Sequence, residues 1–228
     1  MDVASETPRQ PLGRWLREPV NTLTHGLGAL LGVVGLVVLL VLSEGEPWRT
    51  VAFSVYGASL IALYLASSVM HGAIAPARVI RRLRILDHAA IFLLIAGTYT
   101  PITLVALRSE SPGWGWALFG TAWGFAALGI VFKLFWLDAP RWLSVAMYIA
   151  MGWMAMVGIV PMAQALPWGA LTWLLIGGLF YSFGALIYAL KRPDPWPKVF
   201  GYHEIWHLFV LAGSASHFVM MVRYILPA

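Results

Sequence analysis

Two histidines near the C-terminus have the type and spacing of a metal site. Segment 203–207 reads HEIWH and matches the H-E-x-x-H pattern, in which the histidines bind zinc and the glutamate is the base of a metalloprotease. On a helix, His203 and His207 lie on one face, about 6 Å apart along the axis. Glu204 is rotated off that face, so it is either a general base or an interfacial partner for cations.

The remaining parts of a metalloprotease are missing. Zincins take a third protein ligand from further along the chain, and metzincins place a histidine six residues after the second one. Here that position is Gly213, and none of the 21 residues after His207 is acidic. A third ligand must therefore come from upstream, and a metalloprotease is the least favoured function.

The composition places this motif in a membrane protein. Of the 228 residues, 60% are hydrophobic and only 11% are charged, and the mean hydropathy is +0.78. A soluble domain of this size carries more charge on its surface. The absence of cysteine excludes thiolate ligands, so a metal would be held by histidine and carboxylate. The net charge of +5 does not indicate nucleic acid as a partner, because the basic residues lie in short segments between apolar runs.

Seven apolar stretches are long enough to cross a bilayer, which takes roughly 20 residues each. The expected fold is therefore an all-α, seven-transmembrane helix bundle, with a tail over residues 1–21 and one membrane domain over residues 22–228. The predicted spans are 22–42, 48–70, 87–107, 114–136, 141–161, 167–190 and 202–226.

The distribution of charge predicts the orientation. With seven spans, twelve of the fifteen Lys and Arg residues share one side of the membrane: Arg9, Arg14, Arg17, Arg78, Arg81, Arg82, Arg84, Lys133, Arg141, Lys191, Arg192 and Lys198. Only Arg49, Arg108 and Arg223 fall on the other side. The positive-inside rule then puts the N-terminus in the cytoplasm and the C-terminus outside.

Ionisable side chains inside apolar spans are costly in a bilayer and so mark functional candidates. His71 ends the second span, Asp87 begins the third, and His203 and His207 begin the seventh, so all four lie at the cytoplasmic side. Three histidines leave a tetrahedral zinc one open position, as in catalytic sites. The carboxylate of Asp87 is then a proton acceptor or a fourth ligand. Ser67, four residues before His71, shares its helix face.

Other readings compete for these residues. Each histidine could instead make a helix–helix hydrogen bond, which is the favoured reading for a lone intramembrane histidine. Three histidines and an aspartate at one depth favour a metal site. His217 lies roughly 15 Å along the helix from His207 and is predicted to be a packing or cavity-lining group. His88 points about 100° away from Asp87 and is predicted to be its polar neighbour.

Four motifs together resemble a known family. They are EPVNTLTHG (Glu18, Asn21, His25), SSVMH (Ser67, His71), LDHAAIFLLIAGTYTP (Asp87) and GYHEIWHLFVLAGSASHF (His203, His207, His217). In this order they resemble the bacterial hemolysin III family, within the progestin and adipoQ receptor superfamily that includes the adiponectin receptors. The resemblance covers nearly the whole chain.

The resemblance implies a multi-pass protein of the bacterial inner membrane with zinc at the inner side of its seven helices. His71, His203 and His207 would bind the zinc, Asp87 would contact its water, and Ser67 would neighbour the site. By the same resemblance, the first motif would tie the first span to the site as a second layer.

Two departures from the adiponectin receptors limit what is carried over. Glu204 stands where those receptors have glutamine, which leaves open an additional carboxylate role. The chain also lacks their long cytoplasmic N-terminal domain, so no hormone-signalling partner is implied.

Two functions remain in competition. The superfamily is similar in its motifs to alkaline ceramidases, which favours a zinc-dependent hydrolase of amide-linked lipids, with membrane lipids as substrate or ligand. Asp87 would accept the proton of the attacking water, and Ser67 or zinc would stabilise the oxyanion. The alternative is a non-enzymatic membrane-homeostasis, receptor-like or hemolysin-type protein whose zinc is structural.

Overall fold

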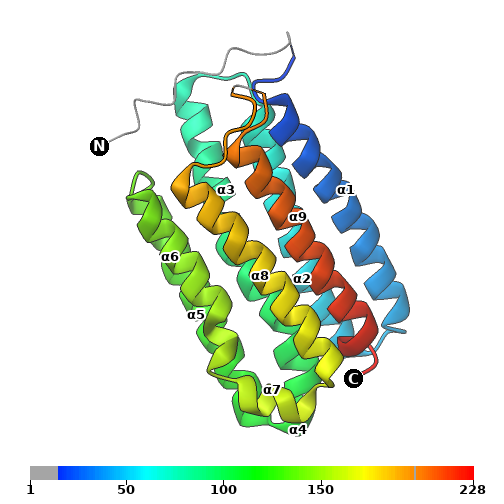
Figure 1. The fold of residues 1–228 in the computed structure, drawn as a ribbon. Helices are drawn as coiled ribbons and strands as arrows, with labels where there is room; N and C mark the ends of the chain where they lie inside the picture. The colour runs from blue at the N-terminus through cyan, green and yellow to red at the C-terminus, as the bar shows by residue number, and fades with distance from the viewer. Residues whose placement is uncertain (1–14, 198) are drawn as a thin grey trace.

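The computed structural model describes residues 15–197 and 199–228, which form one bundle of helices running along a common axis (Figure 1). The described residues contain no β-strand, only an isolated bridge between Trp196 and Phe200. The helices are α1 (Pro19–Leu42), α2 (Pro47–Gly72), α3 (Ala77–Pro101), α4 (Arg108–Glu110), α5 (Pro112–Phe135), α6 (Arg141–Gly152), α7 (Ile159–Ala165), α8 (Trp168–Leu190) and α9 (Tyr202–Met220), with the π-helices η1 (Ile102–Leu107) and η3 (Met221–Ile225) and the 3-10 helix η2 (Trp153–Met156). The predicted all-α membrane architecture is confirmed.

The count of seven depends on one bent segment. Among the described residues, six helices are long and apolar enough to cross a membrane. The segments Arg141–Met156 and Ile159–Ala165 pass the same test together but meet at an angle of 52°. Gly158 lies at the break and Pro161, which has no N–H, follows it. With this pair as one broken span, the protein is a seven-helix membrane bundle.

A tyrosine from another helix supports the backbone at this break. The Tyr99 hydroxyl donates to the carbonyl of Gly152 at 2.8 Å and accepts from the backbone N–H of Ala155 at 2.7 Å. These contacts satisfy backbone groups that the interrupted helix leaves without helical partners.

The third helix is longer than the sequence predicted and lies at the centre of the bundle. It begins at Ala77, ten residues before the predicted span. The basic segment 78–84 contains no helix breaker, so the helix continues through it from Pro76 to the predicted span. In the most apolar window of the stretch Ala77–Glu110, which comprises α3, η1 and α4, 83% of residues are buried inside the protein, compared with 28% for α1. Asp87 consequently sits in the third turn of a continuous helix rather than at a helix start.

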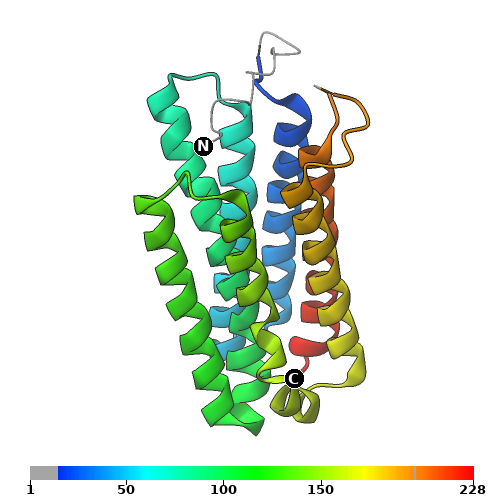
Figure 2. The same cartoon turned by 60° about the vertical axis from the view of Figure 1, so that its left-hand side comes forward.

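Most of the described Lys and Arg residues lie at one end of the bundle. The described chain enters α1 at the end where α9 also begins, and the C-terminus lies at the opposite end (Figures 1 and 2). The segments that join α2 to α3, α5 to α6 and α8 to α9 lie at the first of these ends (Figure 2). The described basic residues therefore gather there, apart from Arg49, Arg108 and Arg223. Arg9, Arg14 and Lys198 lie outside the described residues.

We expect reporter fusions to place the α2–α3 connection (residues 73–76) in the cytoplasm and both the α1–α2 turn (residues 43–46) and the C-terminus outside. The reason is the excess of positive charge at the end where α1 begins. A fusion after Ala228 that reports the cytoplasmic side would contradict this orientation.

Candidate metal centre

Three histidines from two helices meet near the end of the bundle where α1 begins. His71 lies in the last turn of α2, and His203 and His207 lie in the first turns of α9. One ring nitrogen from each lies within 4.8 Å of the other two, and this is the group among the described residues that could hold a metal ion. The structure thus brings together the three residues that the sequence selected as ligands. Binding of a metal stays a prediction.

The arrangement of the three rings fits zinc. Their centroids form a nearly equilateral triangle, with separations of 4.9, 4.9 and 5.0 Å, and the rings are inclined to one another by 69–83°. Three imidazoles on one tetrahedral ion, with Zn–N distances of about 2.0–2.1 Å, would place their centroids about 5 Å apart. The spacing of the ring centroids is therefore that of three imidazoles around one metal ion.

One nitrogen of His71 is already engaged and the other is available. Its Nδ1 lies 2.6 Å from a carboxylate oxygen of Glu18, whereas its Nε2 is buried and makes no hydrogen bond with a described residue. Metal-bound histidines usually hold one nitrogen with a carboxylate in this way, which fixes the ring and leaves the other nitrogen for the ion. An orphaned buried nitrogen beside two further imidazoles is the local signature of a ligand.

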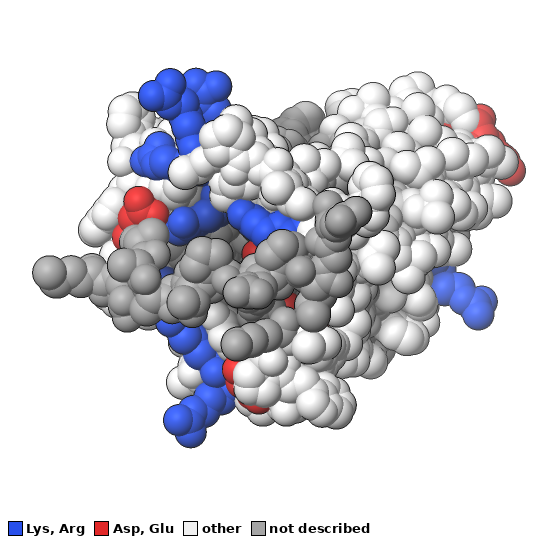
Figure 3. Space-filling model, turned by 90° about the horizontal axis from the view of Figure 1, so that it is seen from above, with Lys and Arg blue, Asp and Glu red and all other residues white. Residues whose placement is uncertain are grey.

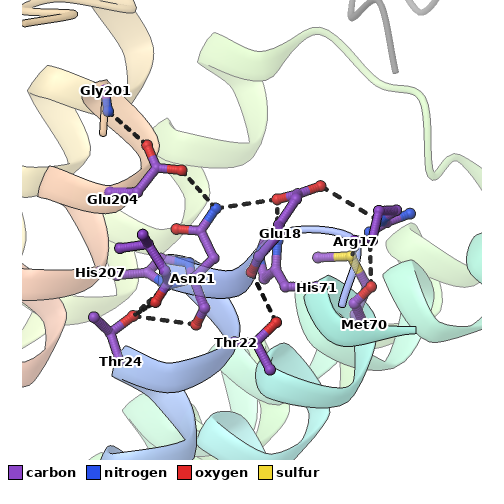
Figure 4. Close-up of polar contacts among 11 residues, drawn as sticks. Arg17, Glu18, Asn21, Thr22, Thr24, Met70, His71, Gly201, Glu204 and His207 are labelled. Carbon is purple, nitrogen blue, oxygen red and sulfur yellow. Dashed lines mark hydrogen bonds and ion pairs between the residues drawn. The ribbon is translucent and has the colours of Figure 1, made fainter. Parts of the chain in front are cut away.

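A buried polar network behind the histidines ties α1 to both partner helices (Figure 4). The Asn21 amide donates to Glu18 Oε2 at 3.0 Å and to Glu204 Oε1 at 2.9 Å. Burial raises the pKa of Glu18, but the hydrogen bond and charge of His71, the charge of His203 and the hydrogen bond from Asn21 outweigh it and lower the pKa to about 2. Glu18 is therefore ionised at neutral pH and suited to hold His71.

Glu204 has a structural partner that the sequence did not reveal. Its side chain is buried, and Oε2 accepts a hydrogen bond of 2.7 Å from the backbone N–H of Gly201, which caps the start of α9. Its other oxygen binds Asn21. Through these two contacts the buried Glu204 side chain helps to hold the helix that carries His203 and His207. The sequence-based readings of Glu204 as a general base or an interfacial partner for cations stay predictions.

His25 contacts the site directly. Its ring stacks on that of His207, with centroids 3.5 Å apart and planes inclined by 9°, and the Tyr64 ring meets it edge-on at 5.0 Å. The close approach of α1 to α2 relies on Gly28, because a Cβ there would collide with the Tyr64 ring. His25 thus limits rotation of a candidate ligand.

Asp87 and Ser67, called here the Asp87–Ser67 pair, line the same cavity as the three histidines. Both side chains are buried. Asp87 is not part of the three-residue cluster that could hold the ion. This placement favours a proton acceptor over a fourth ligand.

The two histidines that the sequence set apart lie outside the cluster. His217 is buried further along α9, and its Nε2 lies 3.2 Å from the carbonyl oxygen of Leu174. His88 follows Asp87 on α3, and its Nδ1 is buried without a hydrogen bond to a described residue. Neither histidine belongs to the group that could hold a metal.

The cluster and the Asp87–Ser67 pair line one large cavity. Its volume is about 2040 Å³, and its wall runs from the three histidines past Ile91 and Leu94 to Trp168 at the far end of α8. Seen from the end where α1 begins, Lys and Arg side chains gather around a hollow (Figure 3). Ligand pockets are typically about 300–1,000 Å³, so this cavity has room for a long acyl chain.

Lys133 lines the cavity, although its place in the sequence does not indicate this. It belongs to the charges that flank a connection, yet its side chain is only 1% exposed. Its Nζ donates to the Ser144 hydroxyl at 2.5 Å. A lysine one turn from a helix end normally extends to the membrane surface, so no local signal distinguished this one.

Replacing Asn21 with leucine is expected to lower the stability of the protein by about 1–3 kcal/mol, because Glu18 and Glu204 would each lose a buried donor. Leu23→Ala is the matched control, since Leu23 lies on the same helix and is 66% exposed. Thermal unfolding in detergent, followed by circular dichroism, measures the difference. Equal midpoints for the two variants would show that the network contributes nothing.

Comparison with known proteins agrees with this architecture. The model of the family described as Haemolysin-III related matches residues 13–218. The chain is 42% identical over 212 residues to Hemolysin-3 of Bacillus cereus, covering 92% of each chain, and 37% identical over 209 residues to the Hemolysin-3 homolog of Bacillus subtilis (strain 168), covering 91% of this chain and 93% of the relative.

More distant relatives extend to eukaryotes. The chain is 25% identical over 210 residues to the human Monocyte to macrophage differentiation factor, covering 90% of this chain and 83% of the relative. It is 31% identical over 153 residues, or 59% of this chain, to the Heptahelical transmembrane protein ADIPOR2 of rice (Oryza sativa subsp. japonica). These matches are consistent with the wider progestin and adipoQ receptor superfamily. The four motifs, the seven-helix bundle and the nearly full-length matches show that this chain belongs to the haemolysin-III related family of multi-pass integral membrane proteins.

Proposed function

We propose that this protein is a zinc-dependent hydrolase of amide-linked lipids, with its reaction site inside the bundle near the cytoplasmic face. The observation that carries the proposal is that the three histidines and the Asp87–Ser67 pair open into the same cavity of about 2040 Å³. A metal that only held helices together would need neither a carboxylate beside it nor a cavity of this size.

The roles of the residues follow from their positions. His71, His203 and His207 would hold zinc, which as a Lewis acid brings the pKa of water to about 7. Asp87 accepts the proton of the attacking water and passes it to the departing amine. Ser67 lines the same cavity, and either its hydroxyl or the zinc would stabilise the oxyanion.

The cavity supports a lipid as the substrate. Aliphatic side chains such as Ile91, Leu94 and Ile95 line it beyond the polar site. An acyl chain placed along this wall would bury apolar surface, with its amide carbonyl at the level of the histidines. A soluble substrate would find few polar partners along this part of the wall.

A structural zinc is the second candidate, and the polar network favours it. The contacts of Glu18 with His71 and of Asn21 with Glu204 join α1 to α2 and α9 at the level of the histidines. A zinc there would complete a clamp between the same helices. The protein would then be a non-enzymatic membrane protein of the receptor-like or hemolysin type.

The two candidates are separated by incubating the purified protein with a panel of amide-linked and ester-linked lipids. We expect release of fatty acid from an amide-linked lipid, loss of this activity on chelation, and its return on addition of zinc. Absence of turnover in protein with full zinc occupancy would leave the structural clamp as the function.

A further inference from the structure

Lys133 places a positive charge inside the bundle where packing alone does not require one. It lies one turn before the end of α5, and its side chain is 1% exposed and lines the cavity. Ionisable groups at membrane depth are costly and usually mark a ligand or ion pathway. Because the side chain turns inward, the usual explanation, that a lysine extends to the membrane surface, does not hold here.

The partners of Lys133 leave part of its charge unmatched. An ammonium group has three N–H donors, and one of them binds the Ser144 hydroxyl of α6 at 2.5 Å. Among the described residues, no carboxylate lies within salt-bridge distance of Nζ. Asp138 is the nearby anion, but it is paired with Arg84 at 3.2 Å. Two donors on a buried cation are thus available to a ligand.

The neighbours of Lys133 point to an anion. His88 and Arg84 on α3 are both close enough to act on it electrostatically, and both line the cavity. The Nδ1 atom of His88 is buried and has no hydrogen bond with a described residue. We call Lys133, Ser144, His88 and Arg84 the Lys133 subsite. The four residues of the subsite are hydrogen-bond donors or cations, which suit anionic oxygens. Asp138, which lies outside the subsite, is the anion paired with Arg84.

The Lys133 subsite belongs to the same cavity as the candidate metal centre but to other helices. Its lysine and serine come from α5 and α6, on the side of the bundle away from α1 (Figures 1 and 2). His88 is next to Asp87 on α3 and lies within electrostatic range of His71. A molecule in the cavity can therefore reach both groups of residues, with aliphatic side chains beside it.

We propose that the Lys133 subsite binds the anionic oxygens of a lipid head group, a phosphate or a carboxylate carried on an apolar chain. With the proposed hydrolase function, this makes the substrate class an anionic amide-linked lipid. The binding itself does not depend on hydrolysis. A head group held by Lys133 would fix how far the lipid enters and so which of its bonds reaches the histidines.

Dodecyl phosphate is the probe, and dodecanol, which has the same chain without the anion, is its control. We expect the purified protein to bind dodecyl phosphate at least about tenfold more tightly than dodecanol, as charge-assisted hydrogen bonds in a buried site imply. A change in the fluorescence of cavity tryptophans such as Trp136 and Trp153 reports the binding. Dodecanoate tests a carboxylate in place of the phosphate, and inorganic phosphate tests the anion without a chain.

Variants assign the preference to Lys133. Lys133→Met and Lys133→Gln should lose the preference for the anion, and Lys133→Arg should retain it. Arg82→Met, which removes a charge from an exposed position at the same end, should behave as the wild type. Using both neutral variants guards against one that fails to fold.

The outcomes distinguish the two proposals. Equal binding of dodecanol and dodecyl phosphate, a preference that survives in the neutral variants, or equally tight binding of inorganic phosphate alone would overturn the subsite. A preference that persists in the wild type and in His207→Ala, while no amide-linked lipid is hydrolysed, would uphold the subsite and reject the hydrolase. Hydrolysis of an amide-linked lipid without any preference for the anion would uphold the hydrolase and reject the subsite.

Discussion

Asp87→Asn is expected to reduce hydrolysis of an amide-linked lipid by about 10²–10⁴-fold, which is the usual cost of removing a general base. Asparagine is nearly isosteric with aspartate and keeps the ability to form hydrogen bonds, but its neutral amide cannot take a proton from water. Asp87 lies outside the group of three histidines, so the variant should keep its metal and its fold. Fatty acid release at saturating lipid measures the rate.

The controls separate catalysis from metal loss. A change beside a metal ligand can itself weaken metal binding by about 10–100-fold, so zinc must be measured in the same preparation. Glu110→Gln removes an exposed carboxylate at the other end of the bundle and should leave the rate unchanged. A zinc-loaded Asp87→Asn protein that hydrolyses lipid as fast as the wild type would reject Asp87 as the base.

Loss of metal on replacing a histidine is the second large effect. We expect the native protein to hold about one zinc per chain, and His203→Ala and His207→Ala to hold almost none after dialysis, because two imidazoles do not complete a zinc site. Elemental analysis by mass spectrometry measures the content.

His217→Ala is the matched control for these variants. It removes another buried histidine from the same helix, but one that bonds to the Leu174 carbonyl instead of joining the cluster. It should retain its zinc. Equal metal content in the wild type and in all three variants would rule out the site.

Much of the site could be inferred from local patterns. Hydropathy identified the helices. The charges between the helices indicated at which end of its helix each polar residue lies. His71 and the two histidines of α9 were therefore predicted to lie at the same end of the bundle. The four-residue spacing placed His203 and His207 on one face. These inferences held because the length of a helix and the rise per residue convert position in the sequence into position along the bundle axis.

The sequence did not reveal how each helix is rotated about its own axis, and therefore which of its side chains face the interior of the bundle. Lys133 and Arg141 both flank the same connection in the sequence, yet only the lysine is buried, with its Nζ on Ser144. The sequence predicted a general base or an interfacial partner for cations at Glu204, and it did not reveal the bonds of this side chain to Gly201 and Asn21. A helix with apolar residues on most sides does not reveal which side faces its neighbours.

The sequence by itself determined that this is a membrane protein of about seven helices with three histidines at one depth, because hydropathy, charge and helical spacing are local properties. Only the tertiary structure decided that Nδ1 of His71 contacts Glu18, and that the three histidines, Asp87 and Ser67 open into a shared cavity. Those facts depend on how α1, α2, α3 and α9 turn toward one another. That is settled by side-chain packing over the whole bundle, with contacts between residues as far apart as Asn21 and Glu204.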